Sequence, residues 1–396
     1  MDSPLKTNWS VVGIAVLSGI VAALYVGKVP PALPFIRSDL NLTMVDGGYV
    51  ISTFNMLGMA MAMLIGTMVD QLNRKLLIFF SFFCLSVGGL IGSLSESLTF
   101  LLFSRMIEGG GFICLAVAMP AIVIAASSEK DRSIAISLWS IFTPAGMALA
   151  LICFPYLEDI FRWQGVWQLL SVLPLIMCGA VAAVFRQLPS PPPVGGNPLQ
   201  LIGQTLSQKG LWLIALTFGG YTLQWVSLMV WLPTFLTGDL GYGQGTAALI
   251  TAGVIAMNIP SNIIGGWCLK KGIDARYMIL VGCGVMGVCV LGILLVPMDN
   301  LYRVIACFCF SLLGGLVPAT MFAYTPRYAP SPGHMSASSG MLMQGSALGQ
   351  FIGPPLLAGA VSLSGGDWVN ALYPMLGGCL LSLVCGYYVI QGKRKG

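Results

Sequence analysis

The chain has 396 residues, of which 57% are hydrophobic and only 8% are charged. Soluble globular proteins carry about 25% charged residues, so this chain lacks the charge needed to cover a water-facing surface. The composition excludes a soluble protein and predicts an all-α integral membrane protein. A β-barrel is excluded too, because barrel strands alternate apolar and polar residues over about 10 positions, whereas the apolar runs here are long and continuous.

Apolar runs between charged and turn residues predict twelve membrane-spanning helices, because each span needs about 20 apolar residues. A segment rich in Pro and Gly at 187–210 is expected to link six helices in residues 1–186 to six more in residues 211–396. The expected helices lie near 9–36, 44–69, 76–94, 98–126, 133–157, 164–186, 211–236, 246–269, 276–297, 301–325, 335–363 and 368–391.

The distribution of Lys and Arg predicts the orientation of these helices. If both ends of the chain lie on one side of the membrane, that side holds 14 of the 19 Lys and Arg residues. Cytoplasmic loops are enriched in these residues. The pattern therefore predicts cytoplasmic termini and an even number of crossings. We expect a multi-pass monomer in the bacterial inner (plasma) membrane, surrounded by lipid.

Two segments at corresponding places suggest an internal repeat. GTMVDQLNRK (66–75) closes the second expected helix and GGWCLKKGIDAR (265–276) closes the eighth, and each puts cations in a tight cytoplasmic turn. Parallel repeats of six helices are a transporter architecture. The fourth expected helix adds SRMIEGGG, with a charged pair inside an apolar run.

In these motifs the chain resembles the major facilitator superfamily of secondary transporters. That family has a Gly after its second helix, an Asp four residues later and then a basic pair, and an Arg-x-x-Gln-Gly pattern in its fourth helix, where this chain has Glu108 in place of Gln. The resemblance implies two six-helix halves around a central cavity, and a latch on the cytoplasmic face. The matching gate residues are Gly66, Asp70, Arg74 and Lys75.

Arg105 and Glu108 are expected to be the only charges deep inside a span. Three residues apart, they share one face of a helix and can pair, and Glu108 would lie about 15 Å below the start of the helix. One interpretation is a switch, in which protonation of Glu108 frees Arg105 to bind a substrate anion. The other is a structural ion pair that fixes helix packing.

Further candidates for substrate binding come from both halves. Lys28 precedes Pro30 and Pro31 near the outer end of the first helix, where it would either line the mouth of the cavity or reach lipid headgroups. The second half offers polar side chains inside spans, which would either orient a substrate or join helices by hydrogen bonds. These are Tyr221, Gln224, Trp225, Asn258, Asn262, Tyr324 and Gln344.

The sequence argues against several other classes of protein. We expect no enzyme and no metal site, because the one histidine, His334, falls in a loop where it should be solvated. Motifs for phosphate binding and for nucleophilic catalysis are missing, so no cofactor is expected and the proton gradient would supply the energy. The sequence contains no soluble basic module, so binding to nucleic acid is not expected.

The sequence thus predicts a proton-coupled transporter that works by alternating access. The preferred hypothesis is symport of a small organic anion, with Glu108 as proton carrier, Arg105 as its partner and anion anchor, and Lys28 along the path. The alternative is a proton-driven antiporter that exports lipophilic or cationic compounds, which 21 Met and abundant aromatic residues would accommodate. A passive facilitator, or a receptor-like protein with a merely structural ion pair, remains a third hypothesis.

Overall fold

The computed structural model describes residues 6–69, 74–184, 198–331 and 334–391, which are all helical or in short connections. The first part contains α1 (Trp9–Gly27), α2 (Val29–Asp39), α3 (Met44–Ser52), the short 3-10 helix η1 (Thr53–Asn55), α4 (Met56–Val69), α5 (Arg74–Ser93), α6 (Leu98–Ala125), α7 (Arg132–Ser140) and α8 (Phe142–Val184). The second part contains α9 (Pro198–Leu206), α10 (Lys209–Gly238), α11 (Gln244–Ala256), α12 (Asn258–Lys270), α13 (Ala275–Leu294), α14 (Asn300–Gly314), α15 (Leu316–Tyr328), α16 (Met335–Leu363), the 3-10 helix η4 (Trp368–Ala371) and α17 (Leu372–Gln391).

The helices form one bundle that crosses a membrane twelve times, as predicted. Eleven segments in the described residues are long and apolar enough to span a bilayer, and one of them, Ile134–Val184, has 51 residues. At 1.5 Å per residue this segment is about 76 Å long, enough for two crossings of a hydrocarbon core of about 30 Å. Its helical path breaks at Arg162, whose φ is 57°.

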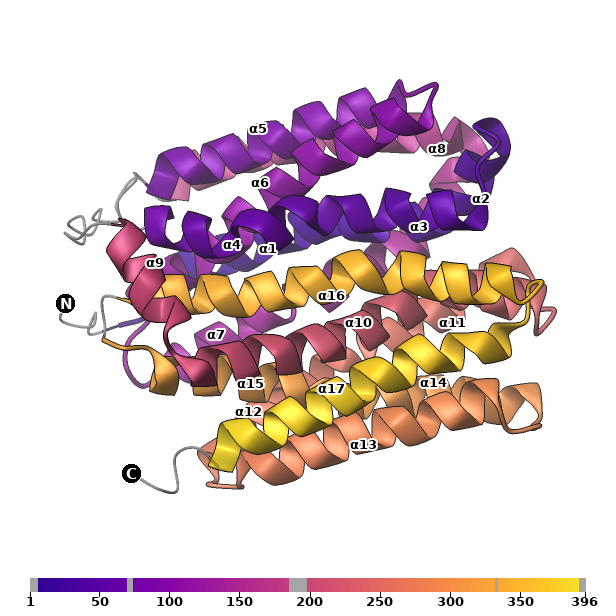
Figure 1. The fold of residues 1–396 in the computed structure, drawn as a ribbon. Helices are drawn as coiled ribbons and strands as arrows, with labels where there is room; N and C mark the ends of the chain where they lie inside the picture. The colour runs from indigo at the N-terminus through magenta and orange to yellow at the C-terminus, as the bar shows by residue number, and fades with distance from the viewer. Residues whose placement is uncertain (1–5, 70–73, 185–197, 332–333, 392–396) are drawn as a thin grey trace.

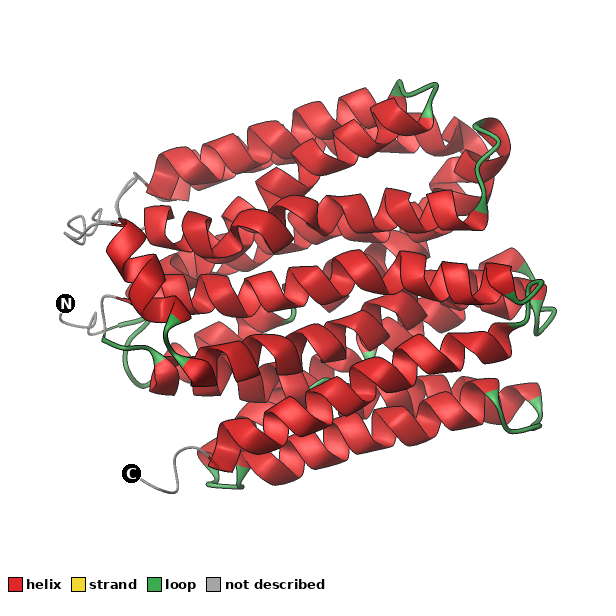
Figure 2. Cartoon of the chain, in the orientation of Figure 1, coloured by secondary structure: helices red, strands yellow, loops and turns green. Residues whose placement is uncertain are grey.

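The two ends of the described chain lie at the same end of the bundle, where α1 begins and α17 ends (Figure 1). We call this the terminal end and the opposite one the far end. At the terminal end the backbone N–H of Asn8 donates to the carbonyl of Ala126 over 2.9 Å. The connections gather at these two ends and leave helices between them (Figure 2), as an even number of crossings requires.

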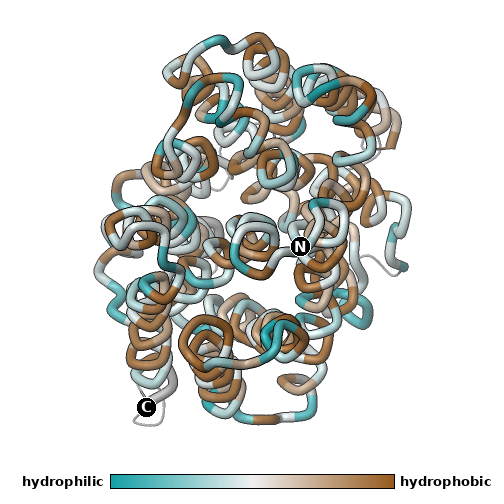
Figure 3. The backbone as a smooth tube through the Cα atoms, turned by 90° about the vertical axis from the view of Figure 1, so that its right-hand side faces the viewer, coloured by the Kyte–Doolittle hydropathy of each residue, from teal (hydrophilic) through white to brown (hydrophobic). Residues whose placement is uncertain are grey.

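Apolar side chains cover the outside of the bundle as well as its core. Along α5, Leu76, Phe80, Phe83 and Leu90 are all about half exposed or more, and their spacing puts them on one side of the helix. Seen along the helices from the far end, hydrophobic residues occupy both inner and outer faces (Figure 3). This outer surface suits a lipid solvent, since water would not tolerate apolar side chains over so large an area.

Five of the expected spans are interrupted by a local change of helix. The first is broken at Lys28, between α1 and α2, and the second contains η1. The fifth, eighth and tenth each break shortly before a proline, at Ile141, Met257 and Gly315. Proline removes a backbone N–H donor and kinks a helix, so the breaks that precede a proline follow from the sequence.

The expected linker contains a short helix, which the sequence analysis did not predict. Residues 187–197 of that segment lie outside the described residues, but α9 occupies Pro198–Leu206, and α10 already begins at Lys209. A Pro at the first position and apolar residues spaced along PLQLIGQTL favour a short helix here. Because α9 lies at the terminal end (Figure 1), it brings polar side chains against the loop after α15.

Glycines let α10 and α16 approach closely, as the repeated small residues of α16 predict. A Cβ atom at Gly349 would lie 2.1 Å from the carbonyl oxygen of Gly219, and one at Gly345 would lie 2.2 Å from that of Ala215. A Cβ atom at Gly353 would lie 2.4 Å from Oγ of Ser227. Each glycine therefore keeps the two backbones in contact.

We expect Gly349→Ala to lower the free energy of unfolding by about 1–3 kcal/mol, the usual cost of overpacking. Gly359→Ala is the matched control on the same helix, because a Cβ atom there meets nothing within 4 Å. Unfolding of both variants in one detergent would be followed by the loss of helical signal. Equal stabilities for the two variants would contradict this account of the contact between α10 and α16.

Candidate functional site

Three charged side chains form a buried cluster inside the first half of the chain. Lys28 Nζ lies 2.5 Å from Glu108 Oε1, and Arg105 Nη1 pairs with Glu108 Oε2. All three side chains are at most 1% exposed. We call Lys28, Arg105 and Glu108 the ion cluster. Charges buried in a membrane are costly and mark functional sites, and here one carboxylate serves two cations.

Local sequence explains how the cluster is assembled. Arg105 and Glu108 are three residues apart on α6, so they share a helix face and pair as predicted. Lys28 caps both α1 and α2, and it occupies the break that precedes Pro30 and Pro31. A Cβ atom at Gly88 of α5 would lie 2.6 Å from Glu108 Cγ. The lack of a side chain at Gly88 thus leaves room for the side chain of Glu108.

Arg105 is fixed by more than its ion pair. Its Nε donates to the carbonyl of Val50 over 3.2 Å, and its Nη1 donates to the carbonyl of Tyr25 over 3.0 Å. The guanidinium also lies 4.5 Å from the ring centroid of Phe54. These contacts join α6 to α1, α3 and η1. They hold Arg105 in place whether or not Glu108 carries a charge.

Lys28 is held differently, by one carboxylate and two aromatic faces. Its ammonium lies 3.6 Å from the ring centroid of Trp167 and 4.6 Å from that of Tyr25. The indole N–H of Trp167 is buried and has no hydrogen-bond partner among the described residues. Within the described ranges, Glu108 is the one carboxylate that pairs with Lys28.

The position of Lys28 corrects two sequence predictions. Its side chain is 0% exposed, so it neither lines a cavity mouth nor reaches lipid headgroups. Arg105 and Glu108 are consequently not the only charges deep inside a span. The helix break turns Lys28 into the bundle, where the carboxylate of Glu108 compensates the desolvation that an extended Lys would avoid by reaching water.

A second group of buried polar side chains lies in the second half of the chain. Asn258 Nδ2 donates to Tyr221 Oη over 3.0 Å and to the carbonyl of Ser311 over 3.2 Å. Trp225 Nε1 donates to Ser311 Oγ over 3.1 Å, and Asn262 Nδ2 donates to Asn258 Oδ1 over 2.8 Å. We call these five residues the polar cluster. Asn258 and Asn262 share one face of α12, as their spacing of four residues requires.

The other predicted polar residues lie elsewhere. Gln224 packs against Gly378 of α17 and donates to the carbonyl of Gly220 over 3.3 Å. The ring of Tyr324 lies 4.3 Å from the guanidinium carbon of Arg327. Gln344 Oε1 accepts from the backbone N–H of Met63 over 3.3 Å, across the contact between α16 and α4.

The predicted gate motif falls partly outside the described residues. Gly66 is buried in α4, and Lys75 is half-exposed near the start of α5. Asp70 lies outside the described residues, and α5 begins at Arg74. The latch between these residues therefore stays a prediction.

His334 is buried rather than solvated, which corrects another sequence prediction. Its side chain is 7% exposed, and its Nε2 lies 2.6 Å from Gln204 Oε1 on α9, with Nδ1 2.7 Å from Ser331 Oγ. Helix α9, which the sequence analysis did not predict, covers the His334 side chain. Within the described part of the chain no group of three His, Cys, Asp or Glu residues could hold a metal ion.

Sequence reasoning missed Tyr25, Trp167 and Ser311. Tyr25 could have been found, because it precedes Lys28 by three residues and so shares its helix face. Trp167 and Ser311 come from helices remote in sequence, and apolar runs give no signal of which helices meet. Their roles depend on tertiary packing alone.

Comparisons with known proteins agree with this architecture. The sequence pattern of the Major Facilitator Superfamily matches residues 15–354. A solved structure of a bacterial homolog to the human lysosomal transporter Spinster has a TM-score of 0.74 and 16% identity, and it covers 97% of this chain and 96% of its own.

Named relatives are distant. The chain is 21% identical to a probable nitrate transporter, NarT, of Staphylococcus epidermidis over 91% of each chain, and 23% identical to a hexuronate transporter of Bacillus subtilis over 70% of each. It spans 33% of the length of an uncharacterized MFS-type transporter of Mycobacterium tuberculosis, at 24% identity over 58% of its own residues.

A match over most of the chain, twelve crossings and a shared fold lead to one assignment. The chain belongs to the Major Facilitator Superfamily, whose members are membrane transporters and not enzymes.

Proposed function

We propose that this chain takes up a small organic anion together with a proton, by alternating access, across the bacterial inner membrane with both termini in the cytoplasm. The observation that carries the proposal is the composition of the ion cluster, which holds two cations and one carboxylate with at most 1% exposure. With all three groups ionised the cluster has a net charge of +1. A buried unpaired charge costs several kcal/mol, so an anion is the ligand that this site favours.

The same charges explain why a proton would travel with the anion. The empty cluster with Glu108 ionised has a net charge of +1. Protonation of Glu108 raises the charge to +2, and one bound monoanion returns it to +1. The empty cluster with Glu108 ionised and the anion-bound cluster with Glu108 protonated then have the same net charge. Burying that charge in the low-dielectric interior therefore costs a similar free energy in both states. A cation would have the opposite effect and raise the buried positive charge.

Each residue of the ion cluster has its own role in this proposal. Glu108 carries the proton, and Lys28 anchors the anion once Glu108 releases it. Arg105 is the positioning residue, because its contacts with the carbonyls of Val50 and Tyr25 do not depend on Glu108. The unpartnered N–H of Trp167 beside Lys28 is a further donor that an anion could use.

The polar cluster would recognise the uncharged part of the substrate. It belongs to the other half of the chain and offers hydroxyl, amide and indole groups with no charge. Such groups orient a ligand by hydrogen bonds. Two relatives are named for anions, nitrate and hexuronate, which supports the anion class without defining the substrate.

A thermal-shift panel on the purified protein tests this proposal. The panel would contain nitrate, small carboxylates, hexuronates and lipophilic cations, each at pH 5.5 and pH 7.5. A ligand at 100 times its dissociation constant should add about 2.7 kcal/mol of stability. We expect anions to stabilise the protein, and more strongly at pH 5.5, because binding that is coupled to the uptake of a proton strengthens as the proton concentration rises.

Arg162→Gln provides a matched control, because Arg162 is a cation of the same half whose side chain is 73% exposed. This variant should respond to the anions as the natural protein does. Stabilisation by lipophilic cations, stronger at pH 7.5, would overturn the proposal in favour of the proton-driven exporter. An equal thermal shift with anions at pH 5.5 and pH 7.5 would contradict the role of Glu108.

A further inference from the structure

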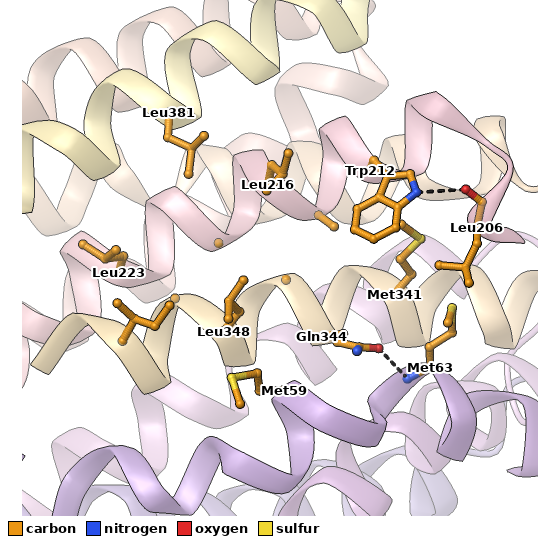
Figure 4. A pocket seen from close by; sticks show the side chains of 15 residues that line it. Met59, Met63, Leu206, Trp212, Leu216, Leu223, Met341, Gln344, Leu348 and Leu381 are labelled. Atoms are coloured by element: carbon orange, nitrogen blue, oxygen red, sulfur yellow. Dashed lines mark hydrogen bonds between the residues drawn. The ribbon is translucent and has the colours of Figure 1, made fainter. Parts of the chain in front are cut away.

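An apolar groove of about 330 Å³ opens on the side of the bundle, away from the ion cluster. Met59 and Met63 of α4 form one wall, while α9, α10, α16 and α17 form the rest (Figure 4). The groove therefore spans the contact between the two halves of the chain. Gly219, Gly345 and Gly349 line it without side chains, where α10 and α16 are in close contact.

The groove faces the lipid phase along its length. Trp212, Leu348, Ile352 and Leu381 line it and are each between 38% and 48% exposed. From Met341 to Ile352 it follows α16 for about 16 Å, at 1.5 Å per residue. In a chain that spans the bilayer, a surface of this kind is in contact with acyl chains.

Polar groups at the terminal end of the groove distinguish it from a plain apolar face. Trp212 stands at this end, where its Nε1 donates to the carbonyl of Leu206 over 2.9 Å (Figure 4). Lys209 is exposed at the first position of α10, three residues before Trp212 and so on the same face of the helix. Trp and Lys at a helix end are typical of the membrane interface.

We propose that the groove is a binding site for one anionic phospholipid. An acyl chain lies along α16 between Met59 and Leu348, and the phosphate is bound by Lys209 at the terminal end. The site does not depend on the proposed transport activity. Because α4 belongs to one half and α16 to the other, the lipid binds this arrangement of the two halves selectively.

The test uses the delipidated full chain and two lipids with the same acyl chains, phosphatidylglycerol and phosphatidylcholine. Native mass spectrometry counts the lipids bound, and the part of the quenching by brominated acyl chains that is lost in Trp212→Phe reports on the groove. We expect one tightly bound phosphatidylglycerol and weaker phosphatidylcholine. Lys209→Gln should weaken phosphatidylglycerol binding about fivefold, the effect of one basic residue at an anionic lipid, and Lys130→Gln, at another exposed cation of the terminal end, should not.

A second pair of variants tests the acyl-chain site itself. Leu348→Phe narrows the groove and should weaken binding of the lipid and reduce its quenching, whereas Leu363→Phe, at a side chain of α16 that is 92% exposed, should leave both unchanged. Melting curves of both variants establish that they are folded. Equal affinity for the two lipids would overturn the proposal. So would an equal rise in melting temperature with inorganic phosphate and with phosphatidylglycerol, or a dimer in place of bound lipid.

Discussion

Glu108→Gln is expected to abolish proton-driven accumulation of the substrate anion while exchange of anion across the membrane continues. The variant resembles the protonated carrier, because it keeps the shape of the side chain and removes its charge. Lys28 and Arg105 then always favour an anion, and binding should lose its dependence on pH between 5.5 and 7.5. Uptake driven by a pH gradient and counterflow in proteoliposomes would measure the two activities separately.

The same variant should be less stable when no anion is present. Removing one partner of a buried ion pair costs about 3–5 kcal/mol, and here both cations lose their charged partner. The double variant Lys28→Gln with Glu108→Gln returns the net charge to +1 and should recover part of this loss. Additive effects of the two substitutions would show that the side chains are not coupled. Retained accumulation in Glu108→Gln would exclude Glu108 as the proton carrier.

The sequence predicted the features that depend on composition and on neighbouring residues. Twelve crossings follow from apolar runs, and the pairing of Arg105 with Glu108 follows from their spacing on one helix. The shared face of Asn258 and Asn262 follows in the same way. In each case the controlling distance lies within one helix, where the geometry is known before the fold is.

The remaining features depend on which helices meet, and a single sequence of apolar spans does not specify that. Lys28 looked like a residue at the membrane surface because prolines follow it, and the partner that buries it lies 80 residues away on α6. Gln224 is adjacent in sequence to Trp225, but it faces α17 instead of joining the polar cluster. His334 is covered by α9, and the sequence does not show that this helix packs against the loop after α15.

Lys28→Gln should weaken binding of the substrate anion about tenfold to a hundredfold, the equivalent of a lost hydrogen bond to a charged group. The protein should nevertheless stay as stable as the natural one, or become more stable. Glu108 still pairs with Arg105 in this variant, and the cluster becomes neutral, so no uncompensated charge remains in the core. Chemical unfolding and anion titration of the same preparation would measure both quantities.

Arg105→Gln is the contrasting variant, since it removes the same charge from the same cluster. It also removes the donors to the carbonyls of Val50 and Tyr25, so it should lower the free energy of unfolding by about 3 kcal/mol or more. If Lys28 anchors the anion and Arg105 positions Glu108, Lys28→Gln should lower the affinity for the anion without loss of stability. Arg105→Gln should lower the free energy of unfolding. Equal losses of stability in both variants would mean that Lys28 is also a structural residue, and unchanged affinity in Lys28→Gln would assign the anion to Arg105.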